Sequence, residues 1–330
     1  MNATQELEAG RPGTRLPRPT MVEVLDSRHL KTAQRRHAQA VVLLSALGLA
    51  LAVGMLAAGH VPTWIDLGIF SGMFLAVGIG STVGFHRHFT HRSFKAVTPV
   101  RVLLAVLGSM AMQGTVIFWV SLHRRHHQCS DAAGDPHSPH VSDQGRQHRS
   151  FLAGLWHSYI GWTFHHEVPN AAYYARDLIR DTPIARVNRH YFLCVALGLL
   201  IPAALGGMLH GSWAGVLSGL VWGGLIRIFV WHNMIWSITS VAHVFGRRDF
   251  DSGDASTNNL WLALPTLGES FHNNHHAFPG SALMGLKWWQ PDLGGWVVLA
   301  LEKLGLAWDV GRPSAELMEK KLVGVRPRRA

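Results

Sequence analysis

Five long apolar stretches constrain most strongly what this chain can fold into. They lie at about residues 39–59, 64–85, 97–120, 191–209 and 213–237. A helix of about 20 residues is about 30 Å long, which matches the hydrocarbon core of a bilayer. Arg101 and Gln113 interrupt the third stretch, so we expect it to be buried or re-entrant. The sequence therefore predicts an all-α integral membrane protein with four transmembrane helices.

Basic residues indicate how these helices are oriented. Lys and Arg flank one end of every predicted span, at Arg28, Lys31, Arg35, Arg36, Arg87, Arg92, Lys95, Arg186, Arg189, Arg247 and Arg248. The turns at residues 60–63 and 210–212 contain neither Lys nor Arg. By the positive-inside rule, the spans form two hairpins in an inner or cell membrane, with both termini and both long polar segments in the cytoplasm. Arg227 lies within the fourth span, and we expect it to snorkel to the interface.

The chain divides into three predicted parts. Residues 1–36 are polar and rich in Pro, which favours disorder; residues 37–311 form the membrane domain; and residues 312–330 form a basic C-terminal tail. The net charge is +10, but no nucleic-acid-reading motif accompanies it, so membrane lipid is the expected partner and nucleic acid is not. Cys129 and Cys194 are far apart and form no CxxC pair.

Three histidine clusters point to a metal site at the cytoplasmic face. They are His86 with His91, then His123, His126 and His127, and finally His272, His275 and His276. Positions i, i+3 and i+4 share one side of a helix, but adjacent residues differ in direction by about 100°. Each triplet therefore suits two neighbouring metal ions rather than one. The i, i+5 pair is about 140° apart on a straight α-helix, so we expect the chain to bend there.

A single histidine outside the clusters is not predicted to bind a metal ion. Of the 22 histidines, those outside the clusters are more simply solvated or hydrogen-bonded, for example His88, His137, His157, His165, His166 and His232. Repetition of the same spacing at one membrane face reverses that preference for the three clusters. His243, just past the fourth span, is a ninth candidate.

The clusters resemble the histidine boxes of membrane fatty-acid desaturases of the stearoyl-CoA (delta-9) type. The segment from His86 to Lys95 is similar to their HxxxxH box, and the other two clusters are similar to their HxxHH boxes. Further matches are Asp135-Pro-His137, Gly268-Glu-Ser-Phe-His272, Phe278-Pro279 and Leu304-Gly-Leu-Ala-Trp-Asp309. The resemblance extends from about Arg35 to Arg312.

This resemblance implies four transmembrane helices under a cytoplasmic helical cap, a di-iron centre and O2-dependent insertion of a cis double bond into a saturated long-chain acyl group. It assigns the iron ligands to His86, His91, His123, His126, His127, His243, His272, His275 and His276. Thr239 stands where the family has an Asn that holds one metal through water. Ser121-Leu122 replaces an Arg-Asp pair that contacts coenzyme A. Acyl-CoA is still the expected carrier of the acyl chain, with a phospholipid or another carrier as the alternative.

Supporting residues are expected around this centre. Groups that fix the imidazole rings are predicted at Asp131, Asp135, Glu269 and Asn273, besides Thr239. Trp119, Trp261 and Leu264 are predicted to line a narrow acyl tunnel. The chain shows no electron-carrier segment, so a ferredoxin or cytochrome-type reductase is the expected electron donor, docking near Arg124, Arg125, Arg247 and Arg248.

Two alternative functions stay open on the sequence. A membrane hydroxylase or alkane monooxygenase shares the histidine-box chemistry but would yield an alcohol. A metal transporter would need ligands near the middle of the bilayer, whereas these clusters lie beyond the ends of the spans. An acyl desaturase is therefore the preferred prediction.

Overall fold

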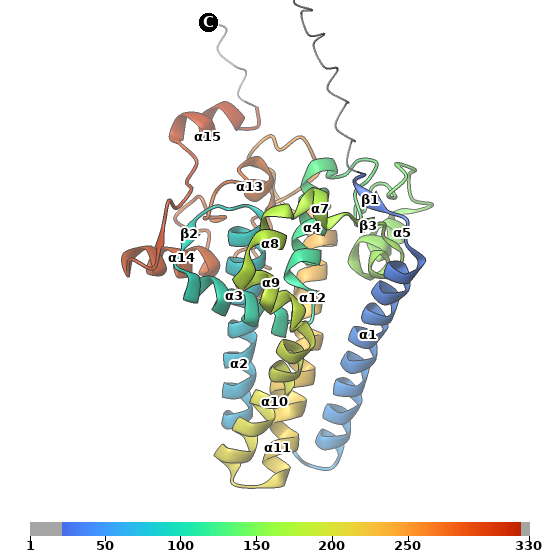
Figure 1. Ribbon diagram of the computed structural model, residues 1–330, viewed down its shortest axis with the longest axis vertical. Helices are drawn as coiled ribbons and strands as arrows, with labels where there is room; N and C mark the ends of the chain where they lie inside the picture. The colour runs from blue at the N-terminus through green and yellow to red at the C-terminus, as the bar shows by residue number, and fades with distance from the viewer. Residues whose placement is uncertain (1–21, 325–330) are drawn as a thin grey trace, which may run out of the picture.

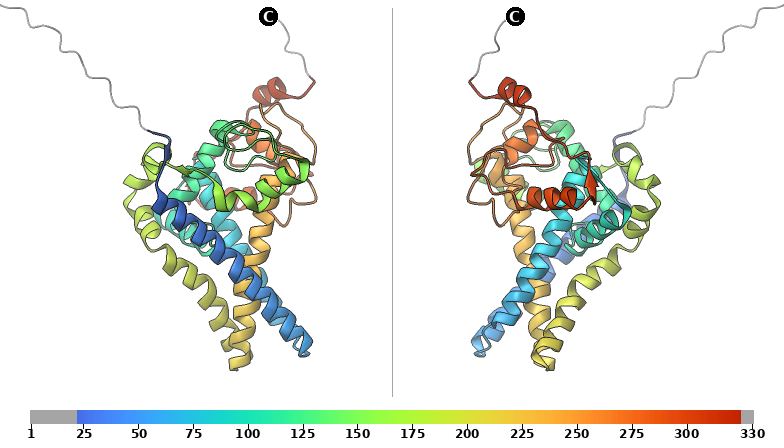
Figure 2. Two further views of the ribbon diagram at one scale, coloured as in Figure 1. Left: turned by 90° about the vertical axis from the view of Figure 1, so that its right-hand side faces the viewer. Right: turned by 90° about the vertical axis from the view of Figure 1, so that its left-hand side faces the viewer.

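The computed structural model describes residues 22–324. Four long apolar helical segments lie side by side, and shorter helices and loops gather at one end of them (Figure 1). We call that end the cap side. The four segments are Arg28–Ala57, Trp64–Thr90, Tyr191–His210 and Trp213–His243, which confirms the four predicted spans. The links between the first and second and between the third and fourth lie together at the opposite end (Figures 1 and 2).

Most of the described residues are helical. Its α-helices are α1 (Arg28–Ala57), α2 (Trp64–Ile79), α3 (Thr98–Met110), α4 (Val116–Cys129), α5 (Phe151–Trp156), α6 (Trp162–His165), α7 (Ala171–Tyr174), α8 (Arg176–Arg180), α9 (Thr182–Arg189), α10 (Tyr191–His210), α11 (Trp213–Gly219), α12 (Arg227–Ser240), α13 (His272–Ala277), α14 (Leu293–Lys303) and α15 (Ala315–Lys321). π-Helical segments are η1 (Gly80–Thr90), η2 (His157–Gly161) and η3 (Leu220–Ile226), and η4 (Val241–His243) is a 3-10 turn. Two short antiparallel pairs join β1 (Val24–Leu25) to β3 (Val168–Pro169) and β2 (Lys95–Ala96) to β4 (Ala307–Trp308).

The boundaries of the tails differ from the prediction. Helix α1 begins at Arg28, where the Ser27 hydroxyl accepts a hydrogen bond from the Leu30 amide (3.4 Å), so residues 28–36 are helical rather than disordered. Likewise, α15 lies within the predicted C-terminal tail. Residues 1–21 and 325–330 of the two predicted tails lie outside the described residues.

The third apolar stretch was predicted not to cross the membrane, and the structure agrees. It forms α3, which has 13 residues and is too short to span a bilayer, followed by a turn into α4. Helix α3 packs closely against η1, because a Cβ atom on Gly80 would lie only 2.1 Å from the Gly108 amide nitrogen. The two glycines thus permit backbone contact, which holds α3 at the cap side beside the second span (Figure 1).

Polar side chains join the two helix pairs at the opposite end of the bundle. The buried carboxylate of Asp66, in the first turn of α2, accepts hydrogen bonds from Thr63 next to it and from His210 (3.1 Å) and Ser218 (2.6 Å) of the other pair. Trp64 and Trp213 lie beside this network with 88% of their surface exposed. Exposed tryptophans of this kind are typical of a membrane interface.

Arg227 is fully buried, so the prediction that it snorkels is wrong. Its guanidinium donates hydrogen bonds to the carbonyl oxygens of Met110 (3.0 Å) and Gly198 (2.8 Å). Pro202 lies inside α10 and has no amide hydrogen to offer the Gly198 carbonyl four residues earlier. Met110 ends α3, and its carbonyl also lacks a helical partner. Arg227 therefore satisfies two backbone acceptors that lipid could not.

Replacing Arg227 by Met should destabilise the protein by several kcal/mol, since each unsatisfied buried carbonyl costs about 1–3 kcal/mol. The Pro202→Ala change supplies an amide hydrogen for Gly198, so the cost of Arg227→Met should be smaller in that background. Thermal unfolding in detergent of the four proteins of this cycle measures the coupling. Arg180→Met, at an exposed position, is the control. Equal costs of Arg227→Met in both backgrounds would contradict the role assigned to the Gly198 contact.

Candidate metal centre

The nine predicted histidines gather into two compact groups beneath the cap. The first, here the five-histidine group, contains His86, His91, His123, His127 and His275. The second, the four-histidine group, contains His126, His243, His272 and His276. Within each group the candidate ligand nitrogens all lie within 4.8 Å of one another. The structure therefore brings together every histidine that the sequence analysis selected.

Helical spacing explains how the histidines are divided between the groups. In α4, His123 and His127 face the five-histidine group while His126 faces the other. In α13, His272 and His276 belong to the four-histidine group while His275 belongs to the first. The prediction that adjacent histidines point in different directions is confirmed, since they belong to different groups.

His86 and His91 share one side of their segment for a reason that the prediction missed. We expected a bend, but η1 is π-helical, and the His91 amide donates to the His86 carbonyl five residues earlier (3.1 Å). A π-helix bonds residue i+5 to residue i, which places residues five apart above one another. The wider winding thus replaces the expected bend.

The ring nitrogens are arranged as ligands of a metal ion would be. In the five-histidine group, the Nε2 atom of His275 lies 3.0 Å from Nε2 of His86 and 2.9 Å from Nε2 of His127. In the four-histidine group, the Nε2 atoms of His243 and His272 lie 3.0 Å apart. Two nitrogens about 2.1 Å from one ion and at right angles lie about 3.0 Å apart. The buried Nε2 atoms of His91, His126 and His276 also have no hydrogen-bond partner among the described residues. The donor set therefore fits two metal ions.

Burial keeps most of these imidazoles ready to bind a cation. It lowers the pKa of His91, His123, His127, His272 and His275 well below the ordinary value, and it lowers the pKa of His276 to about 4. At neutral pH these rings are uncharged, so each has a nitrogen lone pair to donate. Neutral imidazole is the form that binds metals.

Carboxylates fix the orientation of four of the rings through Nδ1. The ring of His243 donates to Asp131 (2.9 Å), that of His126 to Asp135 (3.0 Å) and that of His86 to Glu269, three partners among those predicted. His276 donates to Asp254 (2.5 Å), which sequence reasoning missed because no spacing pattern marks the loop that carries it. With Nδ1 occupied by a hydrogen atom, Nε2 must present its lone pair to the centre.

Opposing effects act on the pKa of these carboxyl groups. Burial alone would raise the pKa of Asp131, Asp135 and Asp254, but hydrogen bonds and charge interactions with their histidines lower each well below its ordinary value. Burial also disfavours protonation of His126, yet Asp135 raises the pKa of that ring. The carboxylates are therefore negative and can balance part of the charge of bound metal ions.

A buried arginine holds Glu269 in place. Arg87 is fully buried in η1 and donates to Glu269 Oε1 (3.1 Å) and to both carboxylate oxygens of Asp292 (2.8 and 3.1 Å). Glu269 in turn accepts from His86. This chain of contacts links the start of α14 to the five-histidine group. The sequence analysis used Arg87 only as a basic residue that flanks the second span.

Two other predicted supporting residues, Asn273 and Thr239, form no hydrogen bond to a histidine ring among the described residues. The Asn273 amide bonds the backbone of Asp249 and Phe250, so it shapes the loop that carries Asp254 rather than orienting a ring. The Thr239 hydroxyl donates to the carbonyls of Ser158 (2.7 Å) and Trp236 (3.0 Å). Thr239 does line the cavity described next, close to the four-histidine group.

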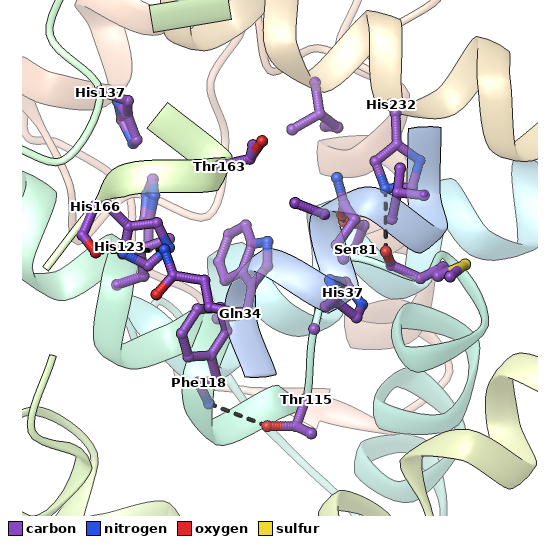
Figure 3. A pocket seen from close by; sticks show the side chains of 18 of the residues that line it. Gln34, His37, Ser81, Thr115, Phe118, His123, His137, Thr163, His166 and His232 are labelled. Carbon is purple, nitrogen blue, oxygen red and sulfur yellow. Dashed lines mark hydrogen bonds between the residues drawn. The ribbon is translucent and has the colours of Figure 1, made fainter. Parts of the chain in front are cut away.

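A cavity of about 410 Å³ lies against both histidine groups. His86 and His123 of the five-histidine group and His126 and His272 of the four-histidine group line it. The rest of its wall comes largely from α1, α4, α6, α10 and α12, with Gln34, His37, Phe118 and His232 pointing toward the same space (Figure 3). Trp119 lines it as predicted. His137, a further buried histidine beside Asp135, lines it too.

Two of the predicted tunnel residues are elsewhere. Trp261 has 92% and Leu264 has 59% of its surface exposed, and neither lines the cavity, so that prediction is wrong for both. Their nearness to the third box in sequence was misleading, because the intervening turn directs them outward. The predicted basic docking surface also changes: Arg124 is paired with Asp177 and Arg125 with Glu167, whereas Arg248 and Arg247, which pairs with Asp249, remain exposed.

Comparisons with known proteins agree with this geometry. The family profile described as fatty acid desaturase matches residues 62–294, a range that includes all nine histidines. A hex-5-enoyl-(acyl-carrier protein) acetylenase of Moorena producens (strain JHB) is 46% identical over 91% of this chain and 93% of its own length. An sn-1 stearoyl-lipid 9-desaturase of Anabaena variabilis is 38% identical over 75% and 85%. An acyl-CoA C20 delta5-desaturase of Anemone leveillei is 34% identical over 79% and 78%.

Replacing Asp254 by Asn should weaken metal binding by about 10- to 100-fold, the usual effect of losing such a partner. The amide can still accept from His276, so the loss of negative charge is what the variant tests. Metal content after dialysis against a graded chelator should fall from about two ions per chain toward one. Asp251→Asn, in the same loop but exposed, is the control. Unchanged retention in Asp254→Asn would show that this carboxylate does not support metal binding.

Proposed function

This chain belongs to the fatty acid desaturase family, and we propose that it is a di-iron acyl desaturase that uses O2 and external electrons to insert a cis double bond into a saturated long-chain acyl group. Its relatives are oxidoreductases that act on acyl chains. We propose a delta-9-like position for the double bond, in keeping with the resemblance of its histidine boxes.

The observation that carries this proposal is that both histidine groups border one cavity. His123 and His126 come from successive turns of α4 and face different groups, yet both line the same space. A methylene group in that space would lie beside both metal positions at once. Aromatic and aliphatic side chains such as Phe118, Trp119 and Ile235 form much of the wall, as expected for an acyl chain.

The nine histidines would hold two iron ions, which supply the oxidising power needed to remove hydrogen from an unactivated methylene. The contribution of the protein is binding and positioning. Asp131, Asp135, Asp254 and Glu269 fix four rings, while Arg87 fixes Glu269. Burial of the histidines would keep bulk water away from the bound acyl chain.

We further propose that the cap and both termini lie in the cytoplasm, with the spans arranged as two hairpins. Basic residues at the cap-side ends of the spans support this orientation. Electrons would come from a separate ferredoxin or cytochrome-type reductase. Arg247 and Arg248 are exposed on the cap and would attract such an acidic carrier, although Asp249 already pairs with Arg247.

The two residues that stand in place of the expected coenzyme A contact argue against acyl-CoA as the carrier. Ser121 is fully buried and its hydroxyl donates to the Ile117 carbonyl (2.7 Å), while Leu122 lies in the cavity wall. Neither can contact a charged headgroup. The three relatives compared above are named for acyl-carrier protein, lipid and coenzyme A substrates.

A second candidate function is the formation of a triple bond. The relative that matches 91% of this chain at 46% identity is named an acetylenase. The same site would serve, because removal of two more hydrogens from an existing double bond needs the same oxidant beside the same carbons. In that case the substrate would be unsaturated before it binds.

Replacing His275 by Ala should abolish new unsaturation, because His275 lies between His86 and His127 in the five-histidine group. Expression in a host without this activity, followed by mass spectrometry of the total fatty acids, measures the product. His60→Ala, an exposed histidine at the opposite end of the bundle, should retain full activity. An alkene supports the main proposal and an alkyne the second candidate, whereas an alcohol, or wild-type activity in His275→Ala, would refute both.

A further inference from the structure

Four exposed lining residues mark where the cavity reaches the surface of the described part of the chain. Of all its lining residues, the four that are exposed are Leu30, Ala33, Arg189 and Phe192. They belong to two segments, the first turns of α1 and the boundary between α9 and α10. The lining residues from the loops that cover the histidine groups, His137 and Glu269, are buried. Among the described residues, the opening therefore lies at the side of the protein and not on top of the cap.

This opening lies at the cap-side edge of the hydrocarbon layer. Helix α10 has 20 residues and is therefore about 30 Å long, which is the thickness of that layer. Its first residue, Tyr191, thus marks the cap-side edge, and Trp213 lies just beyond its last residue at the other edge. The Tyr191 hydroxyl and His37 Nε2 are 2.7 Å apart, which places His37 of α1 at the same depth. Leu30, Ala33 and Gln34 lie one to two turns above, at the level of lipid headgroups.

The rim of the opening combines apolar side chains with positively charged ones, as a site for a lipid would. Phe192 has 79% and Leu30 has 38% of its surface exposed, and both offer apolar contact where an acyl chain would leave the bilayer. Arg189 and Arg186 end α9 directly above, and both are exposed. A guanidinium group at this depth can contact the phosphate of a lipid while its ester-linked chain passes below.

One hydrogen bond closes the seam below the opening. The His37 and Tyr191 side chains join α1 to α10, and both also line the cavity. Tyr191 further accepts a hydrogen bond from the Gly114 amide (3.1 Å), at the turn between α3 and α4 that leads to His123. A chain that enters above this bond is therefore directed inward along α4, toward the histidine groups.

We infer that acyl chains reach the histidine groups sideways from the cap-side leaflet, through a portal formed by Leu30 and Ala33 of α1 and by Arg189 and Phe192 at the start of α10. The substrate is then the acyl chain of a membrane lipid rather than one carried by a soluble thioester. This inference rests on the proposed function, and it adds the route and the class of carrier.

The portal can be tested by narrowing it. Ala33→Trp places a large side chain at the opening, and Ala46→Trp places the same side chain on an exposed part of α1 that does not line the cavity. Metal-loaded protein in lipid nanodiscs, without an electron donor, is photolabelled with a phospholipid that carries a diazirine midway along one acyl chain. Peptide mapping should find label on the α4 segment containing Phe118 and Trp119. Ala33→Trp should lower it by about tenfold, the change given by about 1.4 kcal/mol, and Ala46→Trp should not.

Turnover then separates this inference from the proposed function. With reductase and O2 present, the same acyl chain is offered as a phospholipid in the nanodisc, as acyl-CoA and as acyl-carrier protein. We expect product from the phospholipid, and its loss in Ala33→Trp. Labelling confined to outward-facing residues of the spans, or cavity labelling unchanged in Ala33→Trp, would overturn the portal. Conversion of a thioester alone would overturn the lipid substrate while leaving a desaturase, whereas no unsaturation from any donor would reject the proposed function itself.

Discussion

Lone pairs of nine buried imidazole nitrogens converge into two small volumes, and much of the cap is arranged to hold them there. Without a cation these lone pairs repel one another, and burial prevents water from separating them. Carboxylates on Nδ1 and the Arg87 contacts to Glu269 and Asp292 fix the rings from behind. The loops around Asp131 and Asp254 and the start of α14 therefore depend on the same requirement as the histidines themselves.

The two groups are supported unequally. Three of the four rings in the four-histidine group donate to a carboxylate, whereas only His86 does so in the five-histidine group. The four-histidine group, which has fewer nitrogen ligands, thus has more negative charge nearby. Carboxylate partners make imidazole a stronger donor, so with metal ions bound they would offset the smaller number of nitrogen ligands in the four-histidine group.

Much of the fold and of the site follows from short-range patterns in the sequence. The apolar runs gave the four spans, and helical spacing correctly divided His126 from His127 and His275 from His276. Long-range contacts were beyond such patterns. Asp254 meets His276 across 22 residues without a motif, and Arg227 meets the carbonyl of Gly198 on another helix. Trp261 shows the converse error, because closeness to a box in sequence does not decide which way a turn directs a side chain.

Dependence of α10 on a side chain from α12 has a consequence for how the protein is made. Synthesis proceeds from the N-terminus, so the segments that carry the Met110 and Gly198 carbonyls leave the ribosome before the segment that carries Arg227. Until the last span arrives, both acceptors must be satisfied by water or by the insertion machinery. Helices α3 and α10 therefore cannot reach their final packing before α12 is present. The bundle is complete only when the fourth predicted span has inserted.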